Sequence, residues 1–235
     1  MGRACTRRVG LRLHEARRLA PVHRLLLILL LLTPSLAQAD DLLARLSALA
    51  PKLDGKVLSM ALEARACAAR ERDVGRRLAV IDYSMPSTEV RMWVFDINAR
   101  RLLHAEHVAH GRGSGGNVPT VFSDVEGSYQ TSLGLFAMAE TYTGQNGYSL
   151  RMDGLEPGIN GRARERLIVM HGAGYVDPAQ GRLQGRLGRS WGCPAVRSAV
   201  AQAVIDDLKD GQLLFAYADD ATWLRDSTLL HCPSR

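Results

Sequence analysis

The sequence is poor in aromatic residues, in cysteine and in long apolar runs. Aromatic side chains make up only 6% of the 235 residues, so Val, Leu and Ile must supply most of a core. The apolar stretch 25–32 is too short to span a bilayer comfortably. No internal repeat or low-complexity tract is present. A repeat array is therefore excluded, and the length suits one sizeable domain with a short appendage.

The first 39 residues are typical of an export signal. Seven arginines precede the stretch 25–32, and Ala37-Gln38-Ala39 forms an A-x-A cleavage site. We expect a signal peptide at 1–39 and a mature chain that begins at Asp40. That chain would be exported, periplasmic or associated with the cell wall, with no stable membrane insertion. An uncleaved membrane anchor is the alternative.

Positive charge is concentrated in that segment. The chain has 30 Lys+Arg and 24 Asp+Glu, a formal net charge of +6. Residues 1–39 hold seven arginines and one glutamate, which leaves 23 basic and 23 acidic residues in the remainder. The excess of basic residues belongs to the signal, so the charge does not indicate nucleic-acid binding.

Three cysteines follow the signal: Cys67, Cys193 and Cys232. An odd number in an exported chain favours one disulfide and one free thiol. A Cys67–Cys232 disulfide would tie the N-terminal helix to the C-terminal tail and leave Cys193 reactive. The alternative is that Cys67 is only a small buried residue.

The hydrophobic pattern changes near residue 76. Apolar residues at helical spacing predict an N-terminal helical segment over 40–76, interrupted at Pro51. Ser198 is expected to cap a later helix that runs to Asp210. The expected strands are 78–83, 93–97, 102–109, 167–171 and 213–217. These elements predict a mainly β (α+β) fold, with the principal domain over 77–235.

Two segments of that domain are expected to be irregular. Residues 111–161 are rich in Gly, Ser, Thr and Asn, which predicts short strands and long functional loops. Residues 172–192 are expected to form a loop because glycine and proline recur through it.

His171 and Cys193 are the candidate catalytic pair. His171 lies near the end of a predicted buried strand, and Cys193 lies in a glycine-containing loop before Pro194. A nearby imidazole can form or stabilise a thiolate, in which case Cys193 should ionise below the usual thiol range. The alternative is a buried, inert cysteine. No Asp or Asn near His171 in the sequence is an obvious orienting partner.

The backbone around Cys193 suggests an oxyanion site. Proline has no N–H, so the amide after the nucleophile cannot contribute. The donors that remain are the amides of Trp191, Gly192 and Cys193, and Gly192 allows a close approach of the backbone to a substrate.

Further candidates are weaker. Arg112, in the glycine loop 111–116, would hold a substrate carboxylate with the loop amides, unless the loop is only a turn. That loop matches a dinucleotide fingerprint by letters only, because no helix follows it. Arg189 and Tyr148 are pocket candidates by proximity to motifs, with exposed loop residues as the alternative. No metal site is expected, because His104, His107 and His110 would not converge from one strand.

Three motifs together resemble a known family. They are 110–115, 154–158 and 188–194, the last of which contains Ser190-Trp191-Gly192-Cys193. With His171-Gly172 after an apolar strand, they are similar to the catalytic domain of murein L,D-transpeptidases (YkuD-type). The resemblance is to a divergent branch of this family and covers about 78–232.

The resemblance implies a β-sandwich-like fold and an enzyme that needs no cofactor. Cys193 would be the nucleophile that forms a thioester, and His171 the base, oriented by the Gly172 carbonyl. Ser190 and the residues beside it would contact the substrate, a peptidoglycan stem peptide. An L,D-carboxypeptidase with the same site and a non-catalytic wall-binding domain are the alternatives.

The sequence departs from the common family motif at two positions. Trp191 stands where the motif has histidine, and Ala195 stands where it has arginine. The roles of those two family residues therefore do not carry over.

Overall fold

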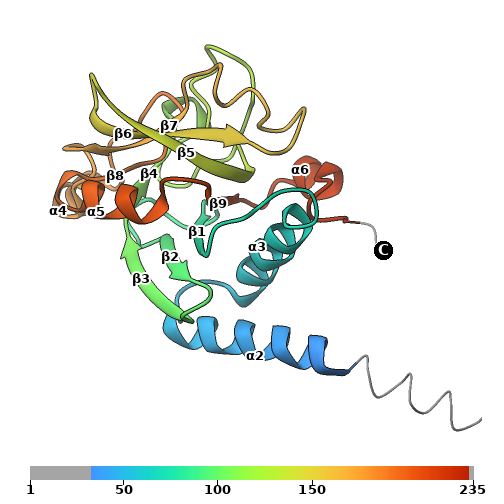
Figure 1. Ribbon diagram of the computed structural model, residues 1–235. Coiled ribbons are helices and arrows are strands. Elements are labelled where there is room, and N and C mark those ends of the chain that lie inside the picture. Colours follow the sequence, from blue (N-terminus) through green and yellow to red (C-terminus); the bar gives the residue numbers. More distant parts are fainter. Residues whose placement is uncertain (1–32, 233–235) are drawn as a thin grey trace, which may run out of the picture. The chain divides into compact units, whose positions relative to one another are not determined.

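The computed structural model describes residues 33–232 (Figure 1). The described residues from Asp41 onward form one compact unit. The predicted signal peptide lies outside the described residues, apart from the backbone of the helix that begins at Thr33. Within the described range, no helix combines the length and the apolar character needed to cross a membrane.

The helices and strands follow one another in a mixed order. The helices are α2 (Thr33–Leu49), α3 (Gly55–Ala68), α4 (Pro178–Gln184), α5 (Ser198–Leu208) and α6 (Ala221–Asp226), with a 3-10 turn, η1, at Arg112–Ser114. The strands are β1 (Arg77–Asp82), β2 (Met92–Asp96), β3 (Arg101–Glu106), β4 (Val108–Ala109), β5 (Gly134–Gly144), β6 (Gly147–Gly154), β7 (Val169–Ala173), β8 (Ala195–Arg197) and β9 (Gln212–Tyr217).

All nine described strands belong to one sheet, in the order β3-β2-β1-β9-β5-β6-β7-β8-β4. The two strands at its ends, β3 and β4, are separated in the chain by His107 alone. The sheet therefore curls until its edges lie near each other, in a nearly closed barrel or sandwich. The mainly β fold predicted from the sequence is confirmed.

The core lies around the central strands β1, β2 and β9, which are buried on both faces. Helix α3 contacts β1, β5 and β9, and α5 contacts β7 (Figure 1). Val57, Leu58 and Ala61 of α3 are at most 2% exposed, because helical spacing places them on one face. Each fully buried Val or Leu stabilises the fold by about 1.5–3 kcal/mol. Helix α3 is therefore part of the same core and not an appendage.

A buried arginine holds β4 in place. Arg91 is 0% exposed, and its Nε and Nη2 donate to the Val108 carbonyl at 3.1 and 2.8 Å. Nη1 donates to the Met85 carbonyl at 2.9 Å, and Nη2 also donates to His110 Nδ1 at 2.8 Å. Because a guanidinium only donates, His110 Nδ1 is the acceptor. Burial and the neighbouring cation lower the pKa of His110 to about 3, so its ring is neutral.

Several sequence-based boundaries were wrong. Residues 134–154 form the long hairpin β5–β6 and not short strands, and α4 lies inside the predicted loop 172–192. Leu167 has a positive φ of 56°, so the strand begins at Val169 and His171 lies at its centre and not near its end. Ser198 is the first residue of α5, and the N-cap position belongs to Arg197.

Cys67 and Cys232 form a disulfide, with their Cα atoms 5.9 Å apart and a sequence separation of 165. The disulfide joins α3 to the tail that follows α6. Among the described cysteines, Cys193 is the free thiol.

Replacing Cys67 and Cys232 together with serine should destabilise the expected mature chain. The chain-entropy model gives an upper limit of about 5 kcal/mol for so long a loop. Chemical unfolding of the variant and the parent without reductant measures the difference. Alkylation of the unfolded, unreduced parent should label Cys193 alone; a second labelled cysteine, or equal unfolding free energies, would contradict the expectation.

Candidate active site

His171 and Cys193 lie in neighbouring backbone segments. Strands β7 and β8 run parallel, and His171 is opposite Ala195, two residues after Cys193. The His171 amide donates to the Pro194 carbonyl at 3.4 Å. Both side chains line one cleft of about 580 Å³, together with Tyr142, Gln145, Asn146, residues 166–169, Tyr175, Arg189, Ser190 and Trp191. The fold thus brings the predicted pair together across the β7–β8 pairing.

The imidazole of His171 is oriented by the backbone. Its Nδ1 lies 3.0 Å from the carbonyl oxygen of Gly172, which can only accept, so Nδ1 carries the proton. Nε2 then has a free lone pair and is the atom able to take a proton. His171 is 4% exposed, and burial lowers its pKa, against the opposing effect of the Gly172 hydrogen bond. The neutral imidazole required of a base is therefore the resting form.

The thiol of Cys193 is held against the segment that precedes β7. Its Sγ accepts a hydrogen bond from the Val169 amide at 3.4 Å and donates to the Leu167 carbonyl at 3.8 Å. Burial raises the pKa of this thiol, while the Val169 amide and the charge of Arg166 act in the opposite direction. The direction is opposite to the low pKa predicted from a Cys–His pair. In the resting cleft both groups are therefore uncharged, the thiol and the imidazole alike.

Ser190 fixes the loop that carries Cys193. Its Oγ donates to the Cys193 carbonyl at 2.6 Å and accepts from the Gly192 amide at 3.1 Å. Gly192 has a φ of 123°, a conformation that favours glycine. The Gly192 amide therefore donates to Ser190, which leaves the amides of Trp191 and Cys193 as the candidate donors to an oxyanion. Within the described chain, neither of these two amides donates to a backbone carbonyl.

The glycine loop 111–116 and its neighbour His110 are hydrogen-bonded to the loop 190–193, which carries Cys193. The Arg112 amide donates to the Ser190 carbonyl at 2.8 Å, and the Ser190 amide donates to the His110 carbonyl at 3.0 Å. A Cβ on Gly111 would lie 2.4 Å from the Tyr129 oxygen and 2.9 Å from the Gly192 Cα. Glycine is required here because two backbone segments approach closely, which gives the loop a structural role in the site.

Two further candidates from the sequence, Arg189 and Arg112, differ in their position relative to the cleft. Arg189 lines the cleft and donates to the Gly115 carbonyl at 2.6 Å. Arg112 is exposed, with its guanidinium carbon 4.3 Å from the ring centroid of Tyr129 and 5.6 Å from that of Trp191. Such stacking places a cation and two aromatic rings at the rim of the cleft.

Tyr148 does not line the cleft. Its hydroxyl donates to Asp206 of α5 at 2.8 Å, so the side chain faces that helix. The hairpin residues that line the cleft are instead Tyr142, Gln145 and Asn146. Proximity to a motif in sequence did not predict the face of the strand.

The three spaced histidines have three different partners. His104 Nε2 lies 2.7 Å from Asp207 Oδ2, and His107 Nε2 lies 3.1 Å from the Thr88 carbonyl oxygen. His110 accepts from Arg91. Each of the three histidine side chains therefore makes a separate polar contact.

Sequence reasoning missed two residues of the site, Arg166 and Tyr175. Both line the cleft, and both interact electrostatically with Cys193. Arg166 lies in the arginine-rich stretch 162–166, where nothing in the sequence separates a buried arginine from exposed ones.

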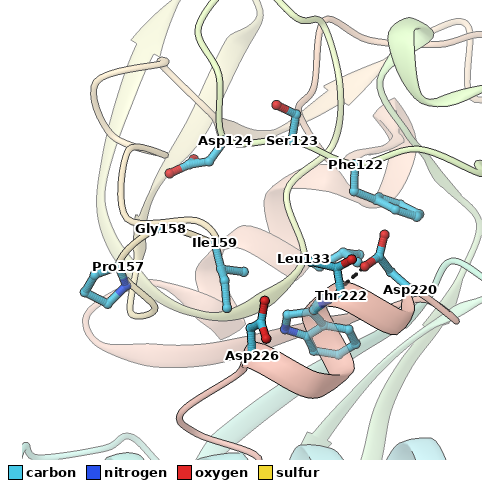
Figure 2. A pocket seen from close by; sticks show the side chains of 11 residues that line it. Phe122, Ser123, Asp124, Leu133, Pro157, Gly158, Ile159, Asp220, Thr222 and Asp226 are labelled. Carbon is cyan, nitrogen blue, oxygen red and sulfur yellow. Dashed lines mark hydrogen bonds between the residues drawn. The ribbon is translucent and has the colours of Figure 1, made fainter.

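A second cavity, of about 530 Å³, contains neither His171 nor Cys193 (Figure 2). Asp124, Asp220 and Asp226 contribute carboxylates to its lining. Asp220 accepts from the Trp223 amide at 2.8 Å and thereby caps α6. This carboxylate has a structural partner, so we place the candidate chemistry in the cleft with Cys193.

The profile of the family described as "L,D-transpeptidase catalytic domain" matches residues 49–217, a range that includes His171 and Cys193. This chain belongs to that family. No curated protein sequence matches it.

Several solved structures are similar to this chain. An L,D-transpeptidase from Mycobacterium smegmatis is 13% identical, with 61% of this chain and 59% of that chain covered and a TM-score of 0.38. Mycobacterium tuberculosis L,D-transpeptidase 1 is 12% identical, with 61% and 62% covered and a TM-score of 0.35. An L,D-transpeptidase from Xylanimonas cellulosilytica is 16% identical, with 63% of each chain covered and a TM-score of 0.35. The chain thus spans about three fifths of the length of these structures.

Gly111→Ala should displace the nucleophile loop, because the added methyl would overlap backbone atoms on both sides. We expect the alkylation rate of Cys193 to change about fivefold or more, since overpacking costs about 1–3 kcal/mol and part of that cost would fall on the loop that carries Cys193. Gly116→Ala is the matched control: it lies in the same loop, and nothing lies within 4 Å of its added Cβ. Equal alkylation rates in the two variants would show that the close approach at Gly111 does not position Cys193.

Proposed function

We propose that this chain is an exported cysteine L,D-transpeptidase that acts on peptidoglycan stem peptides through a thioester on Cys193. The proposal rests chiefly on one observation: His171, oriented by a backbone carbonyl, and the free thiol of Cys193 line the same cleft. Export is supported by the disulfide, since disulfides persist in oxidising compartments. Membership of the family supports the reaction class.

The first half-reaction forms the thioester. Cys193 Sγ attacks the carbonyl carbon of the L-centre of the diamino acid, before a terminal D-alanine, while His171 Nε2 takes the thiol proton. The amides of Trp191 and Cys193 hold the oxyanion. The imidazolium then gives its proton to the departing amine, the C–N bond breaks, and D-alanine leaves.

The second half-reaction transfers the acyl group. An amine of a neighbouring stem attacks the thioester carbonyl and loses a proton to His171. The C–S bond breaks, and the proton returns to Cys193 Sγ. The products are the cross-linked stems and the enzyme in its starting protonation state.

The charge of the cleft suits such a donor. Among its described lining residues, Arg166 and Arg189 are cationic and none is Asp or Glu. Stem peptides carry carboxylates, which the positive potential of these two arginines attracts. The exposed Trp191 and Tyr129, with ring centroids 5.6 Å apart, provide an apolar rim beside this charge.

Ala195 stands where the common family motif has arginine, and Arg197 is the nearest arginine in the sequence. Neither residue takes the place of the family arginine in the cleft. Ala195 is 0% exposed and packs in a small apolar cluster with Ala109 and Val176. Arg197 is engaged by Glu106, with two hydrogen bonds of 2.8 Å. Neither position supplies a cation to the cleft.

The function is tested by incubating the expected mature chain with purified disaccharide-tetrapeptide and identifying the products by mass spectrometry. A cross-linked dimer and free D-alanine are expected from the parent, and neither from Cys193→Ala or His171→Ala. Unchanged circular dichroism would show that both variants fold. Tripeptide and D-alanine without dimer would identify an L,D-carboxypeptidase. Full turnover in either variant, or no product from the parent, would reject the assignment.

The pH dependence should follow His171. Its pKa is lowered by burial, and only the neutral imidazole accepts a proton, so activity should persist below the ordinary histidine value of about 6.5. The acid limb of kcat/KM against pH should therefore have an apparent pKa below about 6.5. An acid limb centred above pH 7 would contradict a desolvated base.

A further inference from the structure

Arg166 is a buried cation in the wall of the active-site cleft. Its side chain is 3% exposed and lies in the cleft lining with Cys193. Nη1 donates to the Ser123 carbonyl at 2.7 Å and to Ser132 Oγ at 2.5 Å. Nη2 donates to the Gln130 carbonyl at 2.8 Å and to Ser128 Oγ at 3.3 Å. All four acceptors are neutral, so these contacts orient the guanidinium without cancelling its charge.

One carboxylate lies close to this charge. Asp124 Oδ1 forms an ion pair with Arg166 Nη1 at 3.5 Å, a longer contact than any of the four hydrogen bonds that the guanidinium donates to neutral acceptors. The other oxygen of Asp124 accepts from the Arg162 amide at 2.8 Å. The nearby Arg164 differs: it is exposed, and hydrogen-bonds with Glu140 and Asp153 neutralise it. Arg166 is therefore only partly compensated.

The chain places Arg166 beside the nucleophile. A Cβ built on Gly192, the residue before Cys193, would lie 3.6 Å from Arg166 Nη2. Three residues after Arg166, the Val169 amide donates to Cys193 Sγ. The segment 166–169 thus supplies a backbone donor to the sulfur and a fixed charge next to Gly192, the residue that precedes Cys193.

The other titratable groups around Cys193 are neutral or directed elsewhere. Burial lowers the pKa of His171, raises that of Tyr175 to about 12, and raises that of Tyr83. Arg189 also lines the cleft, but it donates to the backbone of the glycine loop. Arg166 lies in the same cleft lining, and its charge acts to lower the pKa of the Cys193 thiol against the larger effect of burial.

We propose that Arg166 is a positioning residue whose buried guanidinium stabilises the negative charge that develops on Cys193 Sγ. The inference rests on the proposed role of Cys193 as nucleophile. A permanent charge at this position is needed because the site is desolvated and the resting imidazole is neutral. Asp124 tunes the effect by partly compensating the guanidinium.

The test is the rate of Cys193 alkylation against pH in the folded protein, which requires no peptidoglycan. Arg166→Gln should raise the apparent thiol pKa by about one unit or more, because an opposite charge is lost. Asp124→Asn should lower it, because the guanidinium loses its counter-charge. Arg166→Lys should keep it near the parent value, and Arg164→Gln, which removes a neutralised exposed arginine, should leave it unchanged.

The direction of the shift separates this role from a purely structural one. If Arg166 only held the loop 123–132, its loss would let water reach Cys193 and lower the thiol pKa, since burial is what raises it. A lowered or unchanged pKa in Arg166→Gln overturns the proposal. If that variant does not fold, an unchanged or raised pKa in Asp124→Asn overturns it.

The same measurement distinguishes this inference from the proposed function. Failure of the parent to cross-link stems would reject the transpeptidase while the shifts in thiol pKa still report on Arg166. A parent whose Cys193 resists alkylation at every pH up to 10 would reject the nucleophile and, with it, the role of Arg166.

Discussion

The position of Cys193, the nucleophile in our proposal, depends on a fully buried arginine that has no hydrogen-bonded carboxylate among the residues that the structure describes. Arg91 donates to the carbonyls of Val108 and Met85 and to His110 Nδ1, and so holds β4 beside the start of β2. The His110 carbonyl accepts the Ser190 amide, and Ser190 Oγ holds the Cys193 carbonyl. Removing the guanidinium would leave buried acceptors without donors, which costs about 1–3 kcal/mol for each group. A short series of hydrogen bonds therefore connects the buried Arg91 to Cys193 and helps to fix the position of Cys193.

Desolvation determines the chemistry of the site. The same burial that raises the pKa of Cys193 lowers that of His171, so both groups rest uncharged. Charge then has to be created during the reaction, in surroundings where each fixed dipole or cation acts more strongly than in water. In our proposal, the Val169 amide and the Arg166 guanidinium stabilise the negative charge that forms on Cys193 Sγ. A site of this kind needs no preformed thiolate.

The departures from the family motif follow from packing. The buried Ala195 occupies an apolar cluster with no room for a long charged side chain. Trp191 is 68% exposed and, with Tyr129 and Arg112, forms the rim of the cleft. In our proposal the cation near the nucleophile comes from Arg166, in the segment before β7, and not from β8. In our proposal, the cation therefore comes from a different segment of the chain than in the common family motif.

The sequence alone determined the local features. Apolar runs predicted β1 and β9, and an alternating pattern predicted β2, each to within one residue at either end. Pro194 excluded the amide after Cys193. These features depend only on neighbouring residues. The family motifs predicted the hydrogen bond between His171 and the Gly172 carbonyl. The tertiary structure alone decided which side of a strand faces the cleft, as at Tyr148, and which arginine of 162–166 is buried. It also decided the direction of the Cys193 pKa shift, because desolvation depends on segments that are distant in sequence.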